Sequence, residues 1–191
     1  IDDNNLNFTS TKDRTLSKLG RYDILWIGQG EICENTYFFG RKTEGKIKEF
    51  VEKGGIVISM GQDSDENRPC KTGWIPARFV GVERNGTNEF EVTDTDIPQI
   101  ENLFQEPNKV KTGYFDDAWQ IAPKFIIFAT INNEKDMGIG LLPHGSGFYI
   151  VTSLQNENAD NVALNKPIME NLLSFAINLI QNEFIDELEK V

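Results

Sequence analysis

The fold class is indicated by two apolar stretches, YDILWIGQG at residues 22–30 and GGIVISMG at residues 54–61. Each is a short, nearly continuous apolar run that ends at glycine, as in strands covered on both faces. Between them, TEGKIKEFVEK at 43–53 places its apolar residues on one face of a helix, and Gly54-Gly55 ends that helix. A strand, a helix and a second strand form a βαβ unit, so the two strands are expected to run parallel.

The rest of the chain is interpreted by extension from this unit. Residues 62–124 mix turn residues with short β-prone runs, and we interpret them as an irregular β-rich insertion. Three later apolar runs predict a β-meander, at 124–130, 138–142 and 148–153. A long amphipathic helix with Asn165 as its N-cap then closes the chain. We therefore predict a single α/β domain over residues 1–191, a three-layer sandwich with a mostly parallel central sheet.

Composition excludes some classes of partner. The formal net charge is −11, which repels phosphate backbones and anionic lipid, so neither nucleic acid nor a membrane surface is expected as a partner. No apolar run approaches the roughly 20 residues that span a bilayer. The first residue is Ile rather than Met, and we expect the chain to be part of a larger protein. Its expected partners are other domains of the same polypeptide, a protein partner or a carbohydrate.

The order of these elements resembles the class I glutamine amidotransferase-like, flavodoxin-like family over roughly residues 20–62 and 124–180. In that family a G-x-C-x-G elbow carries the nucleophile, and here the matching residues are Val57-Ile58-Ser59-Met60-Gly61. The family's His-x-Glu falls at Ser153-Leu154-Gln155, which offers neither a base nor a carboxylate. The resemblance therefore implies a degenerate catalytic site.

The chain is most similar to non-catalytic members of that family, which are attached to glycoside hydrolases and multidomain surface proteins. This resemblance implies an extracellular or cell-surface domain with a structural, interaction or ligand-binding role and no cofactor. The alternative is a hydrolase in which Ser59 is the nucleophile and Asp63, Glu31 or His144 assists it.

Ligands of open parallel sheets bind beyond the carboxyl ends of the strands, where this chain is unusually polar. The ligand-binding candidates there are Gln29, Glu31, Gln62 and Asp63. Asp63 and Asp65 are candidate metal ligands, because oxygen-bearing residues alternate as at the start of a calcium loop. The match then fails, since Arg68 stands where an EF-hand requires glycine. A cation site and a solvated acidic loop both remain open.

The two cysteines, Cys33 and Cys70, are placed on loops that leave the same edge of the sheet. We consider them a candidate disulfide, with two buried free thiols as the alternative.

Large aromatic residues of the insertion form the last candidate site. Trp74, Trp119 and Tyr114 precede or flank Asp116-Asp117, and an aromatic ring beside carboxylates is a common way to bind sugar. Trp119 is the ligand-binding candidate of this group. The competing interpretation is that these rings pin the insertion to the body of the domain.

Overall fold

The computed structural model of the chain describes residues 6–32, 39–62, 70–78, 80–93, 109–131 and 135–181. Two α-helices lie in these ranges, α1 (Arg41–Glu52) and α3 (Ala159–Ile180), with one 3-10 turn, η2 (Leu19–Arg21). The strands are β1 (Ile24–Ile27), β2 (Ile56–Ser59), β3 (Gly81–Val92), β4 (Lys109–Gln120), β5 (Ile126–Ile131), β6 (Asp136–His144) and β7 (Gly147–Thr152).

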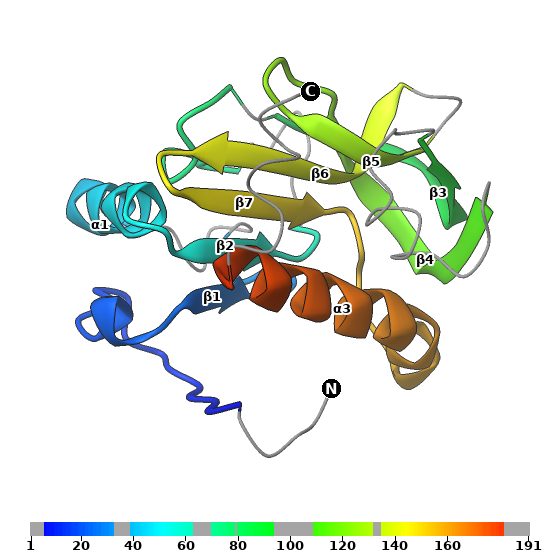
Figure 1. The fold of residues 1–191 in the computed structure, drawn as a ribbon. Helices are drawn as coiled ribbons and strands as arrows, with labels where there is room; N and C mark the ends of the chain where they lie inside the picture. The colour runs from blue at the N-terminus through cyan, green and yellow to red at the C-terminus, as the bar shows by residue number, and fades with distance from the viewer. Residues whose placement is uncertain are drawn as a thin grey trace.

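The described strands form one sheet in the order β1-β2-β7-β6-β4-β3-β5, and β5 also pairs with β6. That additional pairing closes β6, β4, β3 and β5 into a ring, which is a small antiparallel β-barrel. Figure 1 shows the ring on one side of the molecule and β1, β2 and β7 on the other. Strand β7 belongs to both parts, because it pairs parallel with β2 and antiparallel with β6.

The predicted mostly parallel sandwich is therefore wrong. Among the described strands, two pairs are parallel, β1–β2 and β2–β7, and the other five pairs are antiparallel. The predicted irregular insertion at 62–124 is also wrong where the structure describes it, since β3 and β4 are twelve-residue strands there. Antiparallel neighbours need no helical crossover between them, and the pairs that make up the ring are all antiparallel.

The predicted βαβ unit is confirmed, as is the predicted meander of β5, β6 and β7.

The side chains of β2 alternate between two faces. Val57 packs in one cluster with Ile47 and Val51 of α1, whereas Ile56 and Ile58 pack in a second cluster with residues of α3. The two helices therefore pack with opposite faces of β2.

The interior of the ring is filled by aromatic side chains. The rings of Phe90 and Phe115 meet edge to face with their centroids 5.3 Å apart, and both residues are buried. Gly138 of β6 provides the space for this packing, because a Cβ there would lie 2.9 Å from a ring carbon of Phe90. The ring is thus a packed core.

Helix α3 is attached to β4 by two buried asparagine side chains one helical turn apart. The Asn165 Oδ1 accepts a 2.7 Å bond from the Gly113 N–H, and its Nδ2 donates to Gln155 O at 2.7 Å and to Asn156 Oδ1 at 2.9 Å. The Asn161 side chain bonds to both the N–H and the carbonyl of Tyr114. Gly113 permits this approach, because a Cβ there would lie 2.6 Å from the Asn161 Cβ.

This arrangement corrects the predicted start of the helix. The N-cap is Asn158, whose side chain accepts a bond from the Asn161 N–H, and Pro167 lies inside the helix. Asn165 is in the second turn and fully buried, so its side chain serves the contact between α3 and the sheet.

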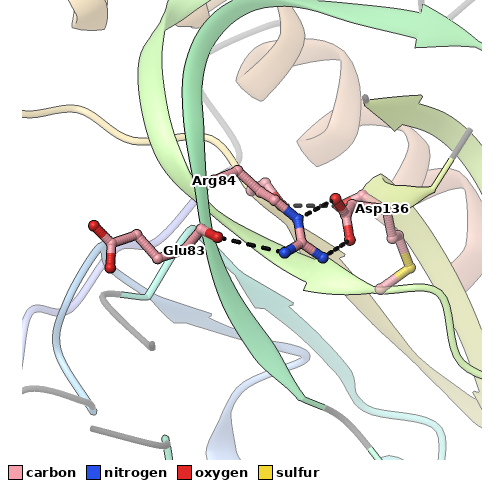
Figure 2. A network of polar contacts seen from close by, with 5 residues as sticks. Glu83, Arg84 and Asp136 are labelled. Atoms are coloured by element: carbon pink, nitrogen blue, oxygen red, sulfur yellow. Dashed lines mark hydrogen bonds and ion pairs between the residues drawn. The ribbon is translucent and has the colours of Figure 1, made fainter. Parts of the chain in front are cut away.

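An ion pair joins two strands of the ring that are not hydrogen-bonded to each other (Figure 2). Arg84 of β3 donates from Nε to Asp136 Oδ2 at 2.6 Å and from Nη2 to Asp136 Oδ1 at 2.9 Å. The Asp136 side chain is 2% exposed and that of Arg84 is 36% exposed. The two parallel hydrogen bonds fix the orientation of the guanidinium group relative to the carboxylate. They also offset the cost of burying the negative charge of Asp136.

We predict that Asn165→Leu lowers the free energy of unfolding by about 3 kcal/mol, because it leaves buried backbone and side-chain groups without their partner. Urea denaturation followed by far-UV circular dichroism measures the change. Lys166→Leu introduces the same side chain at an exposed neighbouring position and should leave the midpoint nearly unchanged. Equal midpoints for the two variants would show that Asn165 does not hold α3 in place.

Arg84→Met is predicted to lower the free energy of unfolding by about 2 kcal/mol, because the buried carboxylate of Asp136 loses a bidentate partner. The matched control is Lys109→Met, which breaks the exposed 2.5 Å pair between Lys109 and Glu89. Exposed pairs contribute little, so this control should behave as the parent chain. A control as destabilised as Arg84→Met would contradict the assignment.

Candidate functional site

The candidate site lies where β1, β2 and β7 end. Because these strands are parallel, their carboxyl ends meet at one edge of the sheet, as the sequence predicts. Three segments follow the strands there, at 28–32, 60–62 and 153–156. Backbone bonds already join them, since Gly30 N–H donates to Gly61 O at 3.1 Å and Gly61 N–H donates to Leu154 O at 2.9 Å.

Gln62 connects two of these segments through its side chain. Its Nε2 donates to the carbonyls of Gly28 at 2.7 Å and Met60 at 3.0 Å, and its Oε1 accepts from the Ile32 N–H at 3.2 Å. The side chain is buried, with 1% of the residue exposed. Both ends of the amide are thus used to fix the loop that follows β1.

Gln29 and Glu31 lie on that loop and differ in their environments. Gln29 is half-buried, and its Oε1 accepts a hydrogen bond from the Asn156 N–H in the segment after β7. Glu31 is exposed, with its Cγ 3.2 Å from the point where a Cβ on Gly28 would lie. Three ligand-binding candidates at this edge are described, Gln29, Glu31 and Gln62, and Glu31 is the exposed one among them.

Ser59 is the last residue of β2 and is fully buried. Its Oγ donates to the carbonyl of Met60 at 3.2 Å. His144 pairs with Gly147, the first residue of β7, whereas Ser59 pairs with Val151 toward the end of that strand. At about 3.3 Å per residue the two side chains are separated by roughly 10 Å or more along the strands.

Sequence reasoning missed a second buried polar pair at this edge. Gln155 Nε2 donates to Asp117 Oδ2 of β4 at 2.9 Å, and both residues are at most 9% exposed. The Gln155 Oε1 is buried without a hydrogen-bond partner. The sequence indicated one of the two residues, since Gln155 directly follows the late apolar run. It did not indicate Asp117, because that residue was placed in the irregular insertion.

Several predicted site residues lie outside the described residues. Asp63 and Asp65 are among them, so the predicted cation site stays a prediction. Cys33 is another, which leaves Cys70 as the single described cysteine and the predicted bridge outside what the structure describes. Cys70 is half-buried, with its Sγ 4.0 Å from the carbonyl oxygen of Ile32.

Two negative findings hold for the described ranges. They contain no group of three or more His, Cys, Asp or Glu side chains arranged to hold a metal ion. Neither described helix has the length and apolar character required to cross a bilayer.

The three candidate sugar-binding aromatics have different exposures. Trp119 is 1% exposed, and its indole N–H donates to Thr152 O at 3.1 Å. Trp74 is fully buried against Tyr149, whose hydroxyl donates to Trp74 O at 3.0 Å. Burial raises the pKa of Tyr149 above its usual range. Tyr114 is different, because half of its surface is exposed.

Comparison with known proteins gives structural neighbours but no family. No family model matches the chain, and no curated protein matches it in sequence. The cytoplasmic protein STM3548 from Salmonella typhimurium is similar in structure, with a TM-score of 0.54, 17% identity and coverage of 83% of this chain and 73% of that one. The cytoplasmic protein STM1381 from Salmonella typhimurium LT2 has a TM-score of 0.52, 14% identity and coverage of 88% and 75%. A β-galactosidase from Bacillus circulans sp. alkalophilus has a TM-score of 0.51, 10% identity and coverage of 84% and 24%.

These findings correct two expectations. The resemblance to the class I glutamine amidotransferase-like, flavodoxin-like family is wrong, because the neighbours are the proteins named above and the sheet closes into an antiparallel ring. The expected extracellular location does not fit neighbours that are described as cytoplasmic proteins. At these identities the likeness establishes the fold alone.

We predict that Gln62→Leu lowers the free energy of unfolding by about 2 kcal/mol, since the Ile32 N–H and the carbonyls of Gly28 and Met60 each lose the hydrogen bond to this side chain. Gln120→Leu is the matched control, because Gln120 is an exposed residue at the end of β4. Chemical denaturation of both variants measures the difference. If Gln62→Leu is no less stable than the control, the side chain does not fix the loop.

Proposed function

We propose that the chain is a non-catalytic binding domain that contacts other domains of the same polypeptide, a protein partner or a ligand. The observation that carries the proposal is the environment of Ser59. Its hydroxyl is fully buried and already donates to the Met60 carbonyl, whereas a serine nucleophile must reach a substrate and give its proton to a base.

The residues suggested as a base give the hydrolase alternative little support. His144 lies toward the other end of the parallel strands, and Glu31 is exposed on the loop after β1. Asp63 lies outside the described residues. The alternative therefore depends on a segment for which no geometry is described.

The hydrogen bonds of Gln62 and Gln29 favour a binding role. They tie the loop at 28–32 to the segments that follow β2 and β7, and so hold its backbone in one conformation. A surface that is already ordered loses less conformational entropy when a partner binds. Glu31 is exposed on this loop and is the residue best placed to make contact.

We predict that the chain has no hydrolase activity that depends on Ser59. The test compares hydrolysis of p-nitrophenyl acetate, p-nitrophenyl butyrate and a p-nitroanilide by the parent chain, Ser59→Ala and Ser153→Ala. Ser153 is the matched control, because it is also fully buried and its Oγ also donates to a backbone carbonyl, at Met137.

All three proteins should give the same low background rate. A rate above background that Ser59→Ala abolishes and Ser153→Ala retains would replace this proposal with the hydrolase alternative.

A further inference from the structure

Tyr114 is held in place from the side of α3. The Asn161 Oδ1 accepts from the Tyr114 N–H at 3.2 Å, and the Asn161 Nδ2 donates to the Tyr114 carbonyl at 3.1 Å. The N–H of the preceding residue, Gly113, is bonded to Asn165. The backbone that carries the ring is therefore fixed by a helix whose asparagines are themselves buried.

The ring of Tyr114 is held from the other side by β3. It lies directly over Gly86, where an added Cβ would be 2.0 Å from the Tyr114 Oη and 2.1 Å from its Cζ. Nevertheless, half of the residue's surface is exposed. The result is an aromatic ring with one side against backbone and the remaining surface open to solvent.

A carboxylate lies on the same face of β4 as this ring. Asp116 is two residues further along β4, so its side chain is on the same face of the strand as that of Tyr114. It is half-buried, whereas the residues on either side of it, Phe115 and Asp117, are buried and point inward. An apolar ring surface and a hydrogen-bond acceptor are thus presented together.

The chemistry of the site selects one class of ligand. An aromatic face suits the C–H face of a sugar ring, and a carboxylate accepts hydrogen bonds from sugar hydroxyls. Nucleotides and acidic sugars also stack or bond, but the net charge of −11 opposes anionic ligands. We infer that Tyr114 and Asp116 form a binding site for neutral sugars, with Gly86 and Asn161 positioning the ring.

This inference rests on the proposed binding role and gives it a ligand class. It also moves the sugar-binding candidate from Trp119, whose ring is in the core, to Tyr114.

The test is an array of neutral oligosaccharides, comprising cello-, xylo-, malto- and galacto-oligosaccharides, followed by titration of any that binds. We expect Tyr114→Ala and Gly86→Ala to weaken binding about tenfold or more, the first by removing the ring and the second by displacing it. Asp116→Asn should also weaken binding, and Tyr114→Phe should retain most of it. Phe8→Ala is the matched control, because Phe8 is an exposed aromatic residue, at 78%, outside this site.

The inference is overturned if no neutral oligosaccharide binds the parent chain, or if Tyr114→Ala binds as the parent does. Far-UV circular dichroism of each variant confirms that a loss of binding is not a loss of fold. Either negative result leaves the non-catalytic proposal intact, because that proposal fails only if Ser59-dependent hydrolysis is found.

Discussion

The buried carboxamide of Asn165 is the constraint on which the arrangement of the two halves depends. Helix α3 packs against the parallel strands through its apolar side chains, and the hydrogen bonds of Asn165 attach it to β4 of the antiparallel ring and to the segment after β7. A buried amide is favourable only when its donors and acceptor are all satisfied. Because its partners lie on different parts of the sheet, this requirement fixes the relative placement of α3, β4 and β7.

The part of the fold that sequence patterns predicted is the part in which packing is regular. The run at 24–27, the helix at 41–52 and the run at 56–59 are apolar with the expected period, and they form the βαβ unit. Strand β3 gave no such signal, because GVERNGTNEFEV exposes several consecutive polar residues and its register with β4 shifts twice. The ring also depends on pairing between β5 and β3, which no local pattern encodes.

The candidate site was predicted in location but not in role. Gln29, Glu31 and Gln62 do lie at the carboxyl edge of β1 and β2, because the topology of parallel strands places them there. Whether a glutamine faces a ligand or a neighbouring loop depends on distances of a few ångströms, which the sequence does not contain. For the same reason the sequence did not show that Trp119 is buried and Tyr114 is exposed. Neither residue was assigned to a predicted strand, so the pattern did not indicate which face of that strand is covered.

Side-chain amides fix helix α3 and the loop after β1 in place by accepting hydrogen bonds from backbone N–H groups. Hydrogen exchange measured by NMR at the amides of Gly113 and Ile32, which donate to Asn165 and Gln62, tests this most directly. Ile32 lies outside the helices and strands, and Gly113 lies within β4 but donates its N–H to Asn165, so each amide has a side-chain oxygen as its hydrogen-bond acceptor. Both should exchange at least about a thousandfold more slowly than the exposed amides of residues 7–10. Exchange at the rate of those exposed amides would contradict the account.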